Sequence, residues 1–339
     1  MRYILWALCA FGLSCGYRPV GDINTATQQV QNRLFTPKEL IDIQLVSGSC
    51  RISAGPADAI HVRVVHRYGP ADKFTATLSE EDNLLRLREE FFSLARSQTE
   101  WTIEAPPQTK FRIHSASGDI ILTELTGPIE VESVSGDIKV RGTTGKLALK
   151  TATADIDLVN CDGDITAETI SGQIRLKDGH GAITAETGSG LIRAQALDGT
   201  LHFTTNSGPI KSKDLSGQLS LHSNSGDISA AALHATGPGF FNTTSGDLAI
   251  GLAQAPAAEM TLQTVSGDAV LDYGGAPISG NFLFYAQVDR GEIIAPFSFD
   301  REEQHELEGH TYQLKSFTRT DDLPQILLRT DSGRVELRP

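Results

Sequence analysis

Acidic side chains recur at one position of a repeated motif, Ser-x-Ser-Gly-Asp, which first stands at residues 115–119 and returns eighteen residues later. Stacked strands would place such carboxylates about 4.8 Å apart, and a hard cation such as Ca²⁺ would relieve their repulsion. An Asp beside a Gly also closes turns through its own backbone bonds, and we favour this interpretation because Gln173, Leu191 and Pro209 interrupt the column. Calcium binding by Asp119, Asp137 and Asp155 therefore stays a minor hypothesis. After the interruption, the column resumes with Asp227, Asp247 and Asp268.

Lys and Arg residues form a second column on the strand that follows each Ser-Gly corner. The alternation of inward and outward residues in a strand predicts that these side chains face outward. A basic stripe of this kind could contact anionic polysaccharide, lipid A phosphates or an acidic protein. Such charges also keep a sheet face solvated and discourage edge pairing, so both interpretations stay open. The opposite strand carries outward acids, Glu130, Glu132, Glu168 and Glu186. The candidate ligand-binding face comprises Lys139, Arg141, Arg175, Lys177, Arg193, Lys211 and Lys213.

Catalytic chemistry has little support in the sequence, and we expect neither an enzyme nor a cofactor. The nine histidines are scattered, no Cys/His set has metal-ligand spacing, and no helix follows the Gly-rich corners as a phosphate loop requires. Some β-helix enzymes cleave acidic polysaccharides with Asp, Arg and Lys on one sheet face. That enzymatic alternative would rest on one cluster, Asp137, Asp155, Arg175 and Lys177.

Small hydroxyl residues stand one and three positions before each corner glycine, as in Ser133 and Ser135 before Gly136. Regular Thr arrays on β-solenoids can bind ice. These positions share the inward parity of Val131 and Leu149, so we expect both hydroxyl columns to turn the corner and satisfy backbone groups.

The elements that position these side chains follow from a strict glycine period. Thirteen slots nine residues apart, from Gly118 to Gly226, hold twelve glycines and Ala154. Between the slots, Ile, Leu and Val alternate with polar residues for about five residues, which is typical of a strand with one buried face. A nine-residue strand and turn cannot bury that face alone, so the repeats must stack.

The period predicts an all-β fold, a parallel β-solenoid whose 18-residue coils contain two strands each and follow a right-handed path. We expect regular repeats over 111–273, a strand-rich N-terminal cap over 36–110 and wider C-terminal coils over 274–339. Thr330-Asp331-Ser332-Gly333 repeats the corner near the C-terminus, and residues 16–35 would form a tether.

The corners SASGDI, SVSGDI, TISGQI, SNSGDI, TTSGDL and TVSGDA resemble those of the DUF4097 family, whose members are bacterial envelope proteins described as adhesins with β-strand repeats. Thr102-Ile103-Glu104-Ala105-Pro106 stands where the family places a strand before its first corner. The resemblance spans roughly residues 41–339. It implies the fold and an envelope location, and it implies no catalytic motif.

The N-terminus indicates export. Arg2 precedes an apolar run over residues 3–13, which is too short to span a membrane. Gly12-Leu13-Ser14-Cys15 resembles a lipobox, so residues 1–15 predict a signal peptide with lipidation at Cys15. An ordinary signal peptide, cleaved near Ser14 or Gly16, is the alternative. In an oxidising envelope Cys50 and Cys161 could pair, or both could be small buried residues.

The net charge of −13, from 29 Lys and Arg against 42 Asp and Glu, argues against nucleic-acid binding. The sequence thus predicts a non-enzymatic, adhesin-like interaction or scaffold protein of the cell envelope or surface, periplasmic or outward-facing. Its partner would be an envelope polysaccharide, lipid or protein, and its lipid anchor would contact the membrane. A polysaccharide-active enzyme and a passive structural spacer are the alternatives.

Overall fold

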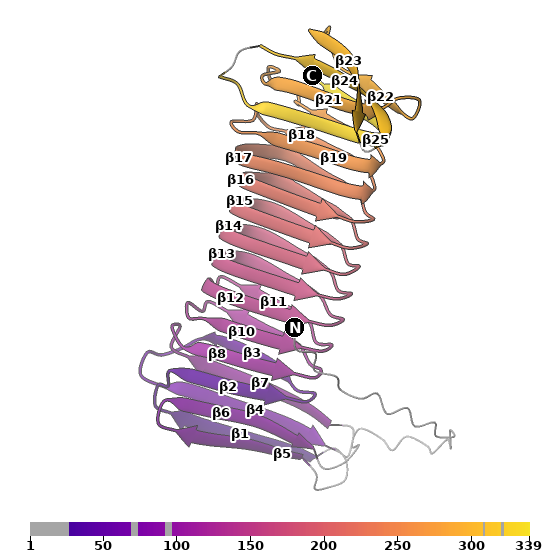
Figure 1. Ribbon diagram of the computed structural model, residues 1–339. Helices are drawn as coiled ribbons and strands as arrows, with labels where there is room; N and C mark the ends of the chain where they lie inside the picture. Colours follow the sequence, from indigo (N-terminus) through magenta and orange to yellow (C-terminus); the bar gives the residue numbers. More distant parts are fainter. Residues whose placement is uncertain (1–26, 69–73, 92–96, 308, 320–321) are drawn as a thin grey trace, which may run out of the picture.

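The protein is built from strands alone in the part of the chain that its computed structural model describes, residues 27–68, 74–91, 97–307, 309–319 and 322–339. Twenty-five strands form one continuous stack, which Figure 1 shows as an elongated shaft. The all-β, solenoid-like fold class is therefore confirmed. The handedness of the coil stays a prediction.

The regular part of the shaft is a parallel stack in which each residue lies beside the one eighteen positions later, as Ile174 lies beside Ile192. Its strands are β8 (Lys110–Ser115), β9 (Ile120–Thr123), β10 (Ile129–Ser133), β11 (Ile138–Arg141), β12 (Thr144–Thr151), β13 (Ile156–Thr169), β14 (Ile174–Thr187), β15 (Ile192–Thr205), β16 (Ile210–Ser223) and β17 (Ile228–Ser245). Residues before each Ser-Gly corner form one sheet face, here the pre-corner face, and residues after it form the post-corner face.

The two halves of a coil meet at a bend rather than at a second corner. In β13 the strand runs on past Asn160, whose φ is 57°, and Gly163, whose φ is 123°. The left-handed conformation turns the chain from one face to the other while the ladder of hydrogen bonds continues. The bend also creates a third inward column that the alternation alone did not predict, and its buried members include Leu125, Thr143, Cys161, Leu197, Leu215, Leu233 and Leu252.

Glycine is required at the corners other than that of Ala154, because successive coils touch there through their backbones. A Cβ on Gly190 would lie 1.8 Å from the carbonyl oxygen of Gly172 in the preceding coil. Since no side chain fits in that space, the glycine period reflects the stacking distance of the coils.

The inner hydroxyl column satisfies backbone groups at most corners, as predicted, and Ser115 and Thr151 are the exceptions among the described residues. The N–H of Gly190 donates to Thr187 Oγ1 at 3.0 Å, and Thr187 Oγ1 donates to the carbonyl of Gly172 at 3.1 Å. The outer hydroxyl column does not share this inward orientation, which corrects our expectation. Ser135 and Thr153 are exposed, because the chain turns between the two positions, and they donate to carbonyls of the preceding coil at 3.1 and 3.2 Å.

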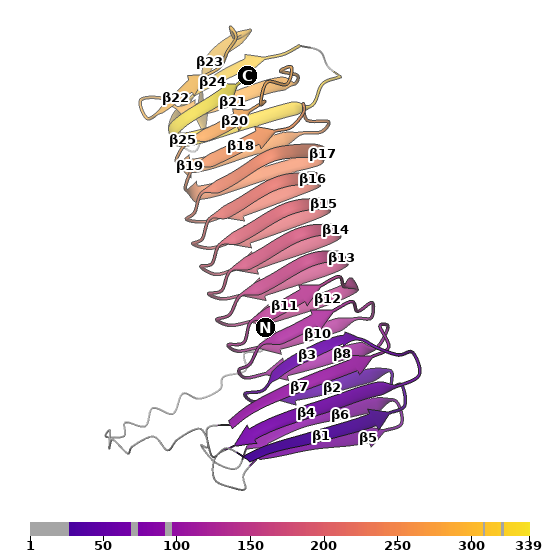
Figure 2. The same ribbon diagram turned by 180° about the vertical axis from the view of Figure 1, so that it is seen from behind.

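The N-terminal end of the stack is assembled out of chain order. The coil of β2 (Leu40–Leu45) and β3 (Ser49–Ala54) lies between the coil of β6 (Leu84–Phe91) and β7 (Ser97–Ala105) and the coil of β8 and β9 (Figure 2). Its corner at Gly48 is an additional copy of the motif. Antiparallel strands close this end, namely β1 (Thr27–Phe35), β4 (Ile60–Tyr68) and β5 (Phe74–Glu81). Residues 27–35 of the predicted tether are thus a strand, because pairing with β4 orders a segment that lacks apolar periodicity.

The C-terminal end of the stack is also assembled out of chain order. The last strand, β25 (Gln325–Arg338), inserts between the coil of β19 (Met260–Ser266) and β20 (Ala269–Asp272) and the coil of β21 (Asn281–Gln287) and β22 (Gly291–Ile294). The C-terminal copy of the corner motif, at Gly333, therefore stacks on Gly267. The remaining strands are β18 (Leu248–Leu252), β23 (Arg301–Leu307) and β24 (His310–Phe317). Stacked rings of Phe297 and Phe317, 4.2 Å between centroids, pack at this end.

Cys50 and Cys161 are buried free thiols, so the predicted alternative of a disulfide is wrong. Cys50 lies in β3, and Cys161 occupies the inward column at the bend of β13. Burial raises the pKa of both thiols, which keeps them protonated.

Candidate anion-binding face

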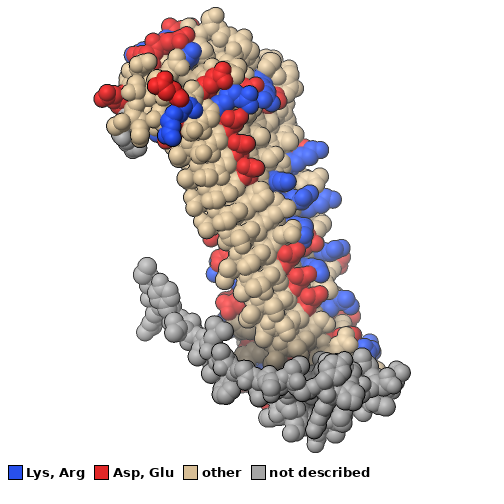
Figure 3. Space-filling model, turned by 90° about the vertical axis from the view of Figure 1, so that its right-hand side faces the viewer, with Lys and Arg blue, Asp and Glu red and all other residues tan. Residues whose placement is uncertain are grey.

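The structure gathers five of the seven predicted cations into one cluster on the post-corner face of β14, β15 and β16. Arg175, Arg193 and Lys211 lie in register on three consecutive strands, and Lys177 and Lys213 flank them on the same face. Figure 3 shows Lys and Arg side chains gathered along one side of the shaft. Adjacent strands lie about 4.8 Å apart, so the cluster presents like charges at that repeat. We call these five residues the basic cluster.

The other two predicted cations, Lys139 and Arg141, lie on β11 and are separated from the basic cluster by β13. In register with them on β13 are Asp157 and Val159, which carry no positive charge. Lys139 Nζ also lies 3.8 Å from Asp119 and 3.3 Å from Asp137, so two carboxylates neutralise it. The continuous stripe that the sequence predicted is therefore broken after β11.

The Asp column binds the backbone of the next coil. The N–H of Asp155 donates to Asp137 Oδ1 at 3.3 Å, and the N–H of Gln173 donates to Asp155 Oδ1 at 2.9 Å. Asp227, Asp247 and Asp268 repeat this bond at the C-terminal end, with distances of 3.0, 2.8 and 2.8 Å to the next N–H. The expected structural role holds, but the bond joins neighbouring coils rather than closing the residue's own turn.

The Asp column is interrupted at the coils that carry the basic cluster. Gln173, Leu191 and Pro209 occupy the Asp position two residues before Arg175, Arg193 and Lys211. Arg175 still reaches Asp155 of the preceding coil at 3.0 Å. Arg193 and Lys211 have no ion pair within 4.0 Å among the residues that the structure describes. The missing carboxylates thus leave charge uncompensated at the middle of the shaft.

The remaining members of the basic cluster have weak partners. Lys177 Nζ lies 3.6 Å from Asp178, and Lys213 Nζ lies 3.9 Å from Asp214. All four side chains are well exposed, and solvent-exposed pairs of this length contribute about 0–1 kcal/mol. A ligand anion can therefore displace them at little cost.

The enzymatic cluster predicted from the sequence does not converge on one point. Asp155 pairs with Arg175, whereas Asp137 pairs with Lys139. Lys177 pairs with Asp178, the next residue, at the bend of β14. Both carboxylates also accept a backbone N–H, so they are held in structural roles.

Metal ligands are equally dispersed. Within the described ranges no group of three or more His, Cys, Asp and Glu side chains could hold a metal ion. The weak calcium candidates Asp119, Asp137 and Asp155 each direct one oxygen to the next coil, and Lys139 lies between the first two.

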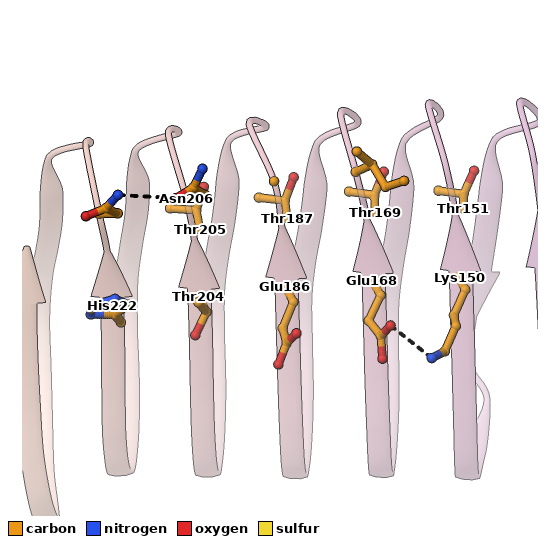
Figure 4. Close-up of a pocket in the computed structure, with 13 residues that line it drawn as sticks. Lys150, Thr151, Glu168, Thr169, Glu186, Thr187, Thr204, Thr205, Asn206 and His222 are labelled. Atoms are coloured by element: carbon orange, nitrogen blue, oxygen red, sulfur yellow. Dashed lines mark hydrogen bonds and ion pairs between the residues drawn. The ribbon is translucent and has the colours of Figure 1, made fainter. Parts of the chain in front are cut away.

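The pre-corner face carries a shallow groove of about 510 Å³ that runs along the shaft beneath the corner loops. Figure 4 shows its outward side chains, Lys150, Glu168, Glu186, Thr204 and His222, in one row. Lys150 Nζ lies 2.9 Å from Glu168, and this bond raises the pKa of Lys150. The acids predicted here are partly neutralised, because Glu130 and Glu132 also face Arg112 and His114 at 3.4 and 3.2 Å.

The predicted export signal and the lipidation candidate Cys15 lie outside the described residues. Among the described residues, no helix has the length and apolarity to cross a membrane.

Stacked eighteen-residue coils joined at Ser-Gly corners define the class of this protein, a parallel β-solenoid with its charged residues on flat outer faces. Residues 199–282 match the model of the family described as Toastrack DUF4097, and this match confirms the family resemblance of the corners. Among solved structures, a similar chain is described as a "putative cell adhesion protein" from Clostridium sporogenes. It is 10% identical, covers 92% of this chain and 99% of its own, and has a TM-score of 0.22. No curated protein matches the sequence.

Proposed function

We propose that this protein is a non-enzymatic interaction protein of the bacterial cell envelope that binds an anionic polysaccharide through its basic cluster. The observation that carries the proposal is the coincidence of the broken Asp column with the cations of β14, β15 and β16. Where the Asp column runs beside a cation of the post-corner face, it compensates that charge, as Asp137 does for Lys139 and Asp155 does for Arg175. At Arg193 and Lys211 that compensation is absent from the described residues.

A polymer suits this surface better than a small anion. The shaft repeats its cations about every 4.8 Å, so one extended chain can contact several coils at once. Each contact is weak because the cations are exposed, but linked contacts raise the overall affinity through effective concentration. The overall charge of −13 would repel anions elsewhere and leave this cluster as the preferred contact.

The proposal includes the cellular location. The N-terminal signal would direct export, and a lipid on Cys15 would tether the shaft to a membrane, periplasmic or at the surface. The resemblance of the corners to a family of envelope proteins, whose model matches residues 199–282, supports a surface role.

The test is retention of isolated envelope polysaccharides by the immobilised chain. We compare the wild type with a variant carrying Arg175→Glu, Lys177→Glu and Arg193→Glu. A matched control carries Arg51→Glu, Arg63→Glu and Arg88→Glu, which change the charge equally on exposed strands of the N-terminal end.

We expect the cluster variant to lose retention and the matched control to keep most of it. Equal retention by all three proteins would refute the proposal. No retention by any of them would favour a passive spacer. Capture of lipid or of an envelope protein in place of polysaccharide would assign the cluster to a different partner.

A further inference from the structure

The corner position of the Asp column contains a built-in carboxylate site. Asp155 accepts the N–H of Gln173 on one oxygen at 2.9 Å and the guanidinium of Arg175 on the other at 3.0 Å. Asp268 does the same with the N–H and the guanidinium of Arg334, at 2.8 and 2.9 Å. The fold thus twice uses one carboxylate to join a corner N–H to a guanidinium on the next coil.

The same two donors, a corner N–H and a guanidinium, recur in the coil that follows Gln173. The Asp carboxylate that would accept from both is absent there. The N–H of Leu191 occupies the place of the Gln173 N–H, and Arg193 occupies the place of Arg175. Gln173 stands at the Asp position of the sequence, but its Oε1 accepts from Arg175 of the same coil at 2.9 Å and not from Leu191 or Arg193. In the part of the chain that the structure describes, neither the Leu191 N–H nor the Arg193 side chain has a hydrogen-bond or ion-pair partner.

We propose that the Leu191 N–H and the Arg193 guanidinium bind a carboxylate of an acidic sugar, which takes the place of the missing Asp side chain. This inference rests on the proposed function and deepens it, because it names the atoms that would hold the polymer. A guanidinium presents a planar pair of donors that matches a carboxylate. Bonds from charged donors to a carboxylate are also the stronger kind of hydrogen bond.

The surroundings of this slot suit a sugar acid. Arg175 and Lys211 lie in register on either side of Arg193, so they supply charge for carboxylates of adjacent sugars. Leu191 and Pro209 are half-buried and apolar, and they offer a surface for the C–H face of a ring. Pro209 has no N–H, so the backbone contribution to the site is confined to Leu191.

The experiment restores the missing carboxylate from within the protein. Gln173→Asp places an Asp below Leu191, where it can accept the free N–H and pair with Arg193 as Asp155 does with Gln173 and Arg175. Gln195→Asp is the matched control, because it adds the same charge on the same exposed face outside the Asp column. Gln173→Asn tests the loss of the Gln side chain alone.

Binding of oligogalacturonate to the full chain is measured by titration calorimetry, with polyphosphate as a second anion and dextran as the neutral polymer. We expect Gln173→Asp to weaken oligogalacturonate binding by about tenfold relative to Gln195→Asp, the loss of one charge-assisted contact. In amide-detected NMR of the wild type, the Leu191 amide should shift with oligogalacturonate and stay unchanged with dextran. Thermal unfolding confirms that each variant is folded.

Different outcomes separate this site from the proposed function. If the triple Glu variant loses oligogalacturonate binding but Gln173→Asp binds as well as Gln195→Asp, the basic cluster stands and the Leu191 site is refuted. If neither variant changes binding, both proposals fail. A Leu191 amide that shifts with polyphosphate alone would reassign the slot to phosphate and overturn the sugar-acid ligand.

Discussion

Replacing Thr187 by Val tests whether the corner hydroxyls stabilise the stack. The substitution keeps the shape of a buried side chain but removes the acceptor for the Gly190 N–H at 3.0 Å and the donor to the Gly172 carbonyl at 3.1 Å. A buried polar group left unpaired costs roughly 1–3 kcal/mol, so two groups predict a loss of roughly 2–6 kcal/mol in the free energy of unfolding.

The chain supplies a matched control in the same column. Thr151 is equally buried, but its Oγ1 has no hydrogen-bond partner among the described residues, and Ala154 takes the place of the corner glycine. Thr151→Val therefore removes no bond, and we expect its unfolding free energy to stay within about 1 kcal/mol of the wild type or to rise.

Urea unfolding followed by circular dichroism measures both variants, and hydrogen exchange of the Gly190 amide reports the local effect. We expect Thr187→Val to lower the urea midpoint and to accelerate exchange at Gly190. Equal stability losses in Thr187→Val and Thr151→Val would refute the assignment of the corner hydroxyls to backbone satisfaction, because packing alone would then explain both.

Three further predictions follow from other parts of the molecule. Burial in β4 lowers the pKa of His66 below 6.5 against the opposing charge of Glu89, so unfolding takes up a proton at acid pH. Stability should be full above about pH 6.5 and fall as the pH drops toward the lowered folded pKa, and His66→Gln should flatten that dependence in thermal melts. Because the Asp column binds backbone N–H groups, calcium or a chelator should leave the melting temperature unchanged. A rise in the melting temperature with calcium would support calcium binding by the Asp column instead. Cys15→Ala should abolish incorporation of labelled palmitate in cells, and unchanged labelling would place the anchor elsewhere.

The regular shaft was predictable from the sequence because each coil must satisfy the same two constraints. A corner such as Gly190 has no room for a Cβ, and an inward position such as Ile192 must be apolar, so both recur at one period. The parity of the strands likewise predicted that Arg193 and Lys211 face outward.

The ends of the stack were harder to predict, because strand order there depends on contacts between distant segments. The corner at Gly48 lies seventy residues before Gly118, on which it stacks, and β4 to β7 intervene. The inward column at the bend was missed because Leu197 and its equivalents break the period-two alternation after a left-handed residue such as Ala196.

The candidate site was visible only in part. The sequence shows that the Asp column is interrupted at Gln173, Leu191 and Pro209. It does not show which hydrogen bonds are lost by that interruption. Only the register shows that the carboxylate of one coil bonds to the N–H of the next, and hence that Leu191 has lost its acceptor.

The most direct test of the central claim is the dissociation constant of oligogalacturonate for the full chain, measured at low and moderate salt. We predict measurable binding that weakens with salt, is lost in the Arg175→Glu, Lys177→Glu and Arg193→Glu variant, and persists in the Arg51→Glu, Arg63→Glu and Arg88→Glu control. Binding that is equally strong in both variants would contradict the account, since the basic cluster would then have no part in recognising the anion.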